Sequence, residues 1–209
     1  MEDARLFREA SFVVTRTPKA LGRALIKLLR RLDMPREHAV RDRAGQPIAR
    51  VVPVTRRWRR ALDTYTRCDV VDAGGTRLLA LRATLQTLVV DDPDGHEIGL
   101  VHNASRLGNS ALVVEFHAGD RGAGMIRGLP TVIGSIAPRK QFPSAPVAFG
   151  LMEVLDADGA AVARVSNTNM FDNLVEIDAS LDGPLRLLTV AFACSLVDHG
   201  WMHLPARVP

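Results

Sequence analysis

Few residues in this chain have the types and spacing that catalysis or metal binding requires. His199 and His203 are four residues apart, so on a helix they would share one face, with Asp198 beside them. A zinc site needs a further protein ligand, and the sequence offers none at a suitable spacing. Histidines are also stabilised near the negative end of a helix dipole, which accounts for the pair without a metal. We therefore predict no metal site.

A glycine-rich segment, residues 122–128 (GAGMIRG), comes close to the fingerprint that binds dinucleotides. Its third glycine is one residue late, and Pro130 with a β-like segment follows where the fingerprint needs a helix. We therefore predict that this segment is a turn. The sequence also contains no P-loop and no nucleophile elbow. We predict a binding protein that is not an enzyme, with no cofactor and no small-molecule substrate.

The strongest chemical signal is a pair of basic clusters in the first third of the chain. Residues 16–31 contain six Lys or Arg and no acid, and leucines within 21–32 repeat at spacings of four, three and four. This spacing places the leucines on one face of an amphipathic helix over about residues 19–34. Such a helix can lie in a membrane interface, with its leucines among acyl chains and its cations on anionic headgroups. Alternatively, the leucine face packs on the protein and the basic face is solvated.

The second cluster, residues 55–60 (TRRWRR), surrounds Trp58 with arginines. An aromatic ring among cations can stack on a nucleic-acid base, but aromatic residues make up only 5% of the chain and no known nucleic-acid motif is present. We therefore favour an anionic lipid surface over nucleic acid as the partner, with a protein partner as an alternative. The candidate lipid-binding residues are Lys19, Arg23, Lys27, Arg30, Arg31, Arg56, Arg57, Arg59 and Arg60.

The net charge of +4 over 209 residues conceals an asymmetry. Residues 1–67 contain 17 Lys and Arg against seven Asp and Glu, whereas residues 68–209 contain 10 against 16. A basic first third is typical of proteins with an anionic partner, although a solvated surface gives the same count. Two cysteines fit a reducing compartment, and the first residues lack the apolar core of a signal peptide. We expect a cytoplasmic protein, peripheral at the inner face of the plasma membrane.

One pattern recurs four times after residue 35. An apolar strand runs into an Asp, a Gly follows three residues later, and an alternating apolar segment comes next. Asp and Gly favour turns because they tolerate positive φ and close local hydrogen bonds. Period-two alternation predicts strands with one buried and one solvated face, roughly ten to twelve in all. The predicted turns contain Asp42 and Gly45, Asp72 and Gly75, Asp92 and Gly95, and Asp156 and Gly159.

The most apolar segment, residues 184–201, is predicted to form a central helix. Pro184 suits the first helical position, and Asp182 is a candidate N-cap or first-turn acid. Over residues 185–197 only Arg186 is charged, and apolar residues occur on all sides of the helix. The apolar run is about 13 residues, against roughly 20 for a membrane span, so we predict a buried core helix with a span as the alternative. The strands would surround this helix as a closed barrel.

The order of these segments resembles a known superfamily. The hairpins lead into a segment around Asn169 and Phe171, and the apolar helix ends in Ala-x-x-Leu-Val-Asp. Over about residues 11–201 this is similar to the phospholipid scramblase, LURP-one-related and tubby C-terminal superfamily. The resemblance implies a twelve-stranded antiparallel barrel around a C-terminal helix, and roles in binding phosphoinositides or other anionic lipids, calcium-linked scrambling or transcription-linked regulation. The matching residues are Asn169, Phe171, Leu174, Glu176, Ile177, Leu181, Asp182, Ala193, Cys194, Leu196, Val197 and Asp198.

The chain departs from scramblase-like members at the acidic calcium-binding segment before their helix. Residues 167–172 (NTNMFD) offer amides where carboxylates are expected, and hard cations prefer charged oxygens, so we expect no calcium site. We predict one mainly β domain over residues 1–209, with a core over about 11–203 and no enclosed pocket. Its expected role is to bind anionic phospholipid. Lipid scrambling with the helix in the bilayer, and a transcription-linked, protein or nucleic-acid interaction, are the alternatives.

Overall fold

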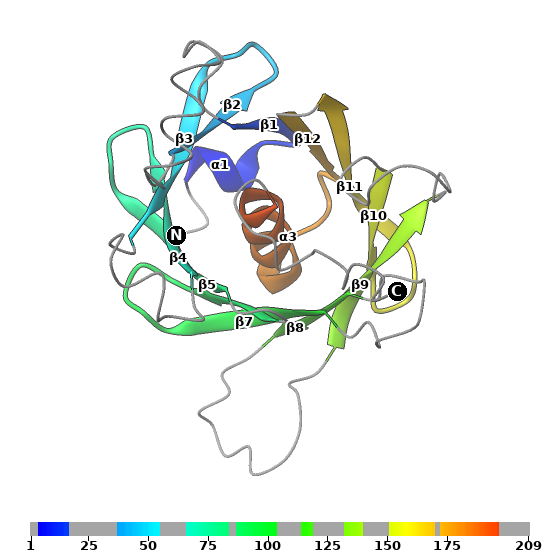
Figure 1. The fold of residues 1–209 in the computed structure, drawn as a ribbon. Coiled ribbons are helices and arrows are strands. Elements are labelled where there is room, and N and C mark those ends of the chain that lie inside the picture. Colours follow the sequence, from blue (N-terminus) through cyan, green and yellow to red (C-terminus); the bar gives the residue numbers. More distant parts are fainter. Residues whose placement is uncertain are drawn as a thin grey trace, which may run out of the picture.

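The computed structural model describes residues 4–16, 37–54, 66–83, 87–103, 114–118, 132–139, 151–169 and 172–196. Within these residues, twelve antiparallel strands form one closed barrel, and the C-terminal helix lies inside it (Figure 1). This arrangement confirms the predicted mainly β fold, a closed barrel around an apolar C-terminal helix.

Each strand pairs with its neighbours in sequence, and β1 closes the barrel against β12. The strands are β1 (Ser11–Arg16), β2 (His38–Asp42), β3 (Pro47–Pro53), β4 (Thr66–Asp72), β5 (Arg77–Ala83), β6 (Thr87–Asp91), β7 (Glu97–Asn103), β8 (Val114–Ala118), β9 (Val132–Arg139), β10 (Leu151–Asp156), β11 (Ala161–Asn169) and β12 (Asp172–Ile177). The helices within the described ranges are α1 (Arg5–Arg8) and α3 (Gly183–Ser195).

The helices agree with the sequence only in part. The amphipathic helix predicted over residues 19–34 lies outside the described residues. The four-residue helix α1, near the start of the chain, was not predicted. Asp182 takes the N-cap position of α3, but its side chain makes no capping hydrogen bond. In the part of the chain that the structure describes, neither helix is long and apolar enough to cross a membrane.

All four predicted turns form, and they share one geometry. In each, the Gly has a φ between 81° and 92° and its N–H donates to the backbone carbonyl of the Asp. The Asp Oδ1 accepts the N–H of the fourth residue after it at 2.8 Å, from Gln46, Thr76, His96 and Ala160 in turn. Each hairpin also shifts register beside its turn, as expected when a glycine with positive φ adds a bulge. The Asp-x-x-Gly spacing therefore closes all four hairpins.

Because consecutive strands run in opposite directions, the segments that join them, called links, lie alternately at the two ends of the barrel. We call one end the hairpin end: it contains the turns 42–46, 72–76, 92–96 and 156–160 and the link 178–182 into α3. The links from β1 to β2 and from β3 to β4 begin and end at the other end, called the opposite end. Helix α3 enters the barrel at the hairpin end, next to α1.

Helix α3 fills the barrel interior. Every residue from Leu185 to Ser195 is buried, which agrees with the apolar residues found on all its sides. The helix packs most extensively on β7 and β8, where Phe192 meets Phe116 edge to face at 5.9 Å between ring centroids. Glycines on the wall make room for it: a Cβ at Gly134 would lie 2.8 Å from Leu185 Cδ1. The helix and the wall thus form one continuous core.

Arg186 is a buried charged residue of α3, at 8% exposure. Its guanidinium donates to carbonyl oxygens at both ends of the chain: those of Phe7 and, at 3.0 Å, Glu9 in the N-terminal segment. It also donates to the carbonyls of Leu181 at 2.9 Å and Asp178 at 3.2 Å. Burial lowers the pKa of Arg186, yet an arginine remains charged at neutral pH. Arg186 therefore fastens α1 and the link into α3 to the start of the central helix.

Replacing Arg186 tests this role. In Arg186→Met the apolar stem remains, but four backbone carbonyls lose a charged donor at a buried position. We expect the free energy of unfolding in urea to fall by about 2–4 kcal/mol, and amide exchange in residues 4–10 to accelerate. Arg41→Met, at an exposed wall arginine, is the control and should change stability by less than about 0.5 kcal/mol. A change below 1 kcal/mol in Arg186→Met, by this estimate, would contradict the fastening role.

Candidate functional site

The described strand ends show where the segments that contain the two basic clusters leave the barrel and rejoin it. All nine candidate lipid-binding residues, Lys19, Arg23, Lys27, Arg30, Arg31, Arg56, Arg57, Arg59 and Arg60, lie outside the described residues. The residues from which their segments depart are described. In the sheet, Arg16 pairs with His38 and His38 pairs with Val51. Pro53 in turn pairs with Cys68.

This register makes neighbours of the strand ends that the two links join. Residues 17–37 leave β1 and return to β2, and residues 54–65 leave β3 and return to β4. Since β1 to β4 are consecutive in the sheet, both links start and finish along one arc of the opposite end. Together they contain ten Lys and Arg and three Asp and Glu. The candidate site is this basic arc.

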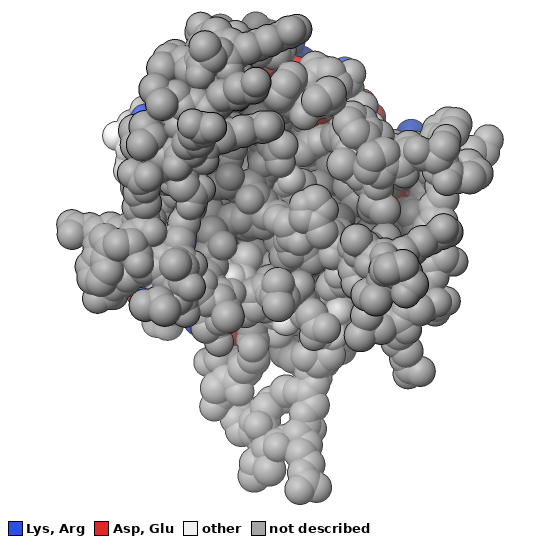
Figure 2. Space-filling view, in the orientation of Figure 1, with Lys and Arg blue, Asp and Glu red and all other residues white. Residues whose placement is uncertain are grey.

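Several charged residues of the described barrel surface form ion pairs with one another. Arg82 binds both carboxylate oxygens of Asp91 at 2.7 Å, and its Nη2 lies 3.8 Å from Glu97. Arg43 binds Glu176 at 2.7 Å across β1. In Figure 2, the described charged side chains that are visible lie at the margin of the view, around the outside of the barrel. Exposed pairs of this kind contribute about 0–1 kcal/mol each, so they offset charge locally and stabilise the fold only weakly.

The acidic residues near 167–172, the segment compared above with the calcium segment of scramblase-like proteins, are engaged by protein groups. Glu176 accepts from Arg43, and Asp178 accepts from both the N–H and the Oγ of Ser180. These two hydrogen bonds lower the pKa of Asp178. Asp172, at 9% exposure, also has an interaction partner. Among the described residues, these three carboxylates do not form a group with oxygens close enough to hold one metal ion.

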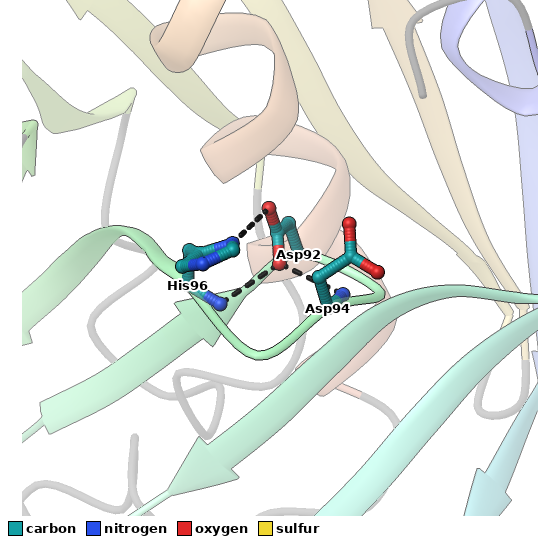
Figure 3. A group of neighbouring side chains, drawn as sticks. All are labelled: Asp92, Asp94 and His96. Carbon is teal, nitrogen blue, oxygen red and sulfur yellow. Dashed lines mark hydrogen bonds and ion pairs between the residues drawn. The ribbon is translucent and has the colours of Figure 1, made fainter.

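One cluster of potential metal ligands was missed from the sequence. Asp92, Asp94 and His96 lie in the turn between β6 and β7, and a ligand atom of each lies within 4.8 Å of the others (Figure 3). Asp92 Oδ1 accepts the N–H groups of Asp94 and His96 at 2.9 and 2.8 Å, while its Oδ2 lies 3.3 Å from His96 Nδ1. The spacing Asp-x-Asp-x-His within a predicted turn was the signal that could have identified it.

The turn itself accounts for the carboxylate of Asp92. Asp156 makes the same pair of bonds, to the N–H groups of Asp158 and Ala160, although its turn contains no histidine. Partial burial acts to raise the pKa of Asp92, but hydrogen bonds from the His96 backbone and ring and from Asp94 outweigh it, and the pKa is lowered. The Asp92 carboxylate therefore closes its hairpin, as the equivalent aspartates close the other three.

Two surface grooves flank α1 at the hairpin end. The larger, about 480 Å³, contains Arg5 with its partners Glu9 and Asp42, and Arg43 with its partner Glu176. The smaller, about 320 Å³, lies over the start of α3. Since cations and carboxylates alternate along the larger groove, it offers no preference for ligands of either charge.

The two cysteines offer no nucleophile. Cys68 on β4 and Cys194 on α3 are both buried and unbridged. Burial, with a contribution from Cys68, raises the pKa of the Cys194 thiol to about 12. At neutral pH that sulfur is protonated, and the thiolate is the reactive form.

Comparisons with known proteins add a similarity of overall structure. The chain matches no family model and no curated protein. Among solved structures it is similar to a protein from Arabidopsis thaliana, with 13% sequence identity, a TM-score of 0.48, and coverage of 90% of this chain and 87% of that one. These comparisons assign neither a family nor an activity.

The hairpin role of Asp92 predicts a pH effect. Because its pKa is lowered on folding, the ionised carboxylate stabilises the fold above its unfolded pKa of about 3.9, and this contribution is lost as pH falls through the lower folded pKa. We expect Asp92→Asn to lower the melting temperature at pH 7, and the difference from the unsubstituted protein to narrow below about pH 4. His96→Ala, which keeps the backbone bonds, is the control. The melting temperatures are compared from pH 7 to pH 2.5 at steps of about half a unit. If the difference between Asp92→Asn and the unsubstituted protein stays constant over this range, the stabilising role of the ionised Asp92 is refuted.

Proposed function

We propose that this protein is a non-enzymatic intracellular module that binds anionic phospholipid surfaces through the basic arc at the opposite end of its barrel. The observation that supports it best is the register of β1 to β4, since the links 17–37 and 54–65 depart from neighbouring strand ends. Membership of the scramblase, LURP-one-related and tubby-like superfamily, and a peripheral position at the inner face of the plasma membrane, belong to the same proposal.

Charge alone gives this arc a substantial affinity for an anionic membrane. Each Lys or Arg held near such a surface contributes about 1 kcal/mol, and the attraction fades within a Debye length of about 8 Å at physiological salt. Ten cations on two adjacent links therefore act together, whereas the same number dispersed over the barrel would not. If the leucines of residues 21–32 insert among the acyl chains, apolar burial adds to the electrostatic term.

Lipid scrambling is disfavoured by the position of α3. For the helix to enter a bilayer it would have to leave an interior in which every residue from Leu185 to Ser195 is buried. The four hydrogen bonds of Arg186 would also break. A surface contact needs neither change. We therefore propose peripheral binding with the barrel intact.

Vesicle co-sedimentation tests the proposed function. The protein should pellet with vesicles that contain phosphatidylserine, at about 0.15 M salt, and should stay in solution with neutral phosphatidylcholine vesicles. Changing Lys27, Arg30 and Arg31 to Glu should abolish pelleting, because six units of charge are lost from the arc.

A matched control separates the arc from net charge. Arg41, Arg77 and Arg164 are exposed arginines of the wall, so changing them to Glu removes the same charge away from the arc. This variant should still pellet. Equal loss of binding in both variants would indicate attraction by net charge alone. Failure of the unsubstituted protein to pellet would reject lipid binding in favour of a protein or nucleic-acid partner.

A further inference from the structure

The N-terminal segment, residues 4–10, lies in the mouth of the barrel at the hairpin end. Leu6 and Phe7 of α1 are buried and belong to the core, and in Figure 1 α1 lies beside α3 within the ring of strands. The segment also lines both surface grooves, with Glu9 on the larger and Phe7 on the smaller. If the segment moved away, the two grooves would join over the start of α3.

Arg186 presents one edge of its guanidinium to this segment. Its Nε donates to the carbonyl oxygen of Phe7, and its Nη2 donates to that of Glu9 at 3.0 Å. Its Nη1 donates instead to the link before α3, at Leu181 and Asp178. Nε and Nη2 form an edge of the guanidinium that can bind a carboxylate through two parallel hydrogen bonds. The carbonyl oxygens of Phe7 and Glu9 therefore take the places of the two oxygens of one carboxylate.

The charge of Arg186 is not neutralised by a carboxylate within the described ranges of the chain. All four of its acceptors are backbone carbonyls. Buried charges are normally paired with an opposite charge, and hydrogen bonds between two charged groups are shorter and stronger than those to a neutral acceptor. A carboxylate on this edge would make stronger hydrogen bonds than the carbonyls it replaced, and it would also neutralise the guanidinium.

The smaller groove combines this guanidinium with apolar side chains. Arg8 and Asp182 also line it, but both are exposed and they carry opposite charges. Displacing the N-terminal segment would add to the groove the volume that Leu6 and Phe7 occupy. The enlarged site would then offer one buried cation in apolar surroundings. The apolar residues that would remain as its lining are Ala179, Leu181 and Leu187.

We infer that the N-terminal segment occupies a binding site for a single-chain amphiphile with a carboxylate head, a medium-chain fatty acid in chemical class, which displaces the segment. The carboxylate takes the Nε–Nη2 edge of Arg186, and the acyl chain takes the volume of Leu6 and Phe7. Because this edge is buried, the head group has to enter the mouth of the barrel, which suits one acyl chain better than a two-chain phospholipid. The site is separate from the basic arc, so it does not depend on the proposed function.

The segment and the ligand compete for the same place. The apparent affinity is therefore the intrinsic affinity reduced by the fraction of molecules in which the site is open. A substitution that weakens the hold of the segment should strengthen ligand binding, although it also lowers stability. A substitution that lowers stability elsewhere in the core should not strengthen binding. This difference distinguishes a displaced segment from general loosening of the fold.

Hydrogen exchange of the unsubstituted protein tests the displacement directly. Decanoate, below its critical micelle concentration and without vesicles, should accelerate amide exchange in residues 4–10 by about tenfold or more, because their contacts with Arg186 and the core are lost. Decanol has the same chain without the charge and should leave this exchange unchanged. Exchange in α3 is followed in the same samples and should not accelerate, since the helix stays in the barrel.

Two leucine variants provide a matched pair for calorimetric titration with decanoate. Leu6→Ala weakens the segment and should bind about tenfold more tightly. Leu88→Ala makes the same change on β6, at a residue that is also fully buried, and should bind within about twofold of the unsubstituted protein. Arg186→Met should lose the preference for decanoate over decanol.

The outcomes separate the site from the proposed function. Faster exchange in residues 4–10 with decanoate alone, and tighter binding in Leu6→Ala than in Leu88→Ala, support the site. Unchanged or slower exchange in residues 4–10, an equal response to decanol, or equal affinities in the two leucine variants overturn it. None of these samples contains a membrane, so their failure leaves the proposed function to be decided by vesicle pelleting.

Discussion

The structure depends on filling the space inside a closed twelve-stranded barrel. A barrel of about eight strands has an interior that its own side chains can fill, whereas a wider one encloses volume that something else must occupy. Here α3 occupies it, and contact on all sides explains why its apolar residues are not confined to one face. Gly99 and Gly134 lie where the helix approaches the wall, since even a Cβ there would meet a leucine of α3. Helix and wall therefore depend on each other for their core.

Arg186 holds the start of α3 in place through hydrogen bonds. A buried guanidinium needs acceptors, and the backbone carbonyls of Phe7, Glu9, Leu181 and Asp178 supply them. This arrangement joins the first residues of the chain to the last helix, across 177 positions of sequence in the case of Glu9. The hydrogen bond to Phe7 also holds α1, whose Leu6 and Phe7 are part of the core at the hairpin end. One charged residue thus joins the segment before β1 and the link after β12 to the start of α3.

The same topology relates sequence to surface charge. In an up-and-down barrel, alternate links join strands at opposite ends, so the four Asp-x-x-Gly turns all lie at the hairpin end. The acidic turns combine two roles, because the aspartate that gives them negative charge also closes the hairpin by accepting backbone N–H groups. The aspartates that close the turns therefore also place negative charge at the hairpin end.

The sequence by itself determined the features that arise from local chemistry. Asp-x-x-Gly turns follow from a positive φ at glycine and from Asp Oδ1 accepting a nearby N–H, as at Asp72 and Gly75. The barrel around an apolar helix followed from strand alternation and from a helix without a polar face, with the family resemblance. The basic residues were found by charge, and their role remains a prediction because they lie outside the described residues.

Only the tertiary structure decided which distant residues meet. The four-residue helix α1 is too short for a periodic signal, and its burial depends on Arg186 from the other end of the chain. The grouping of Asp92, Asp94 and His96 depends on side-chain directions within a folded turn. The strand ends from which the two basic links depart are neighbours because of sheet register, which places His38 between Arg16 and Val51. Register is set by packing and pairing across the whole barrel, so no local stretch of sequence contains it.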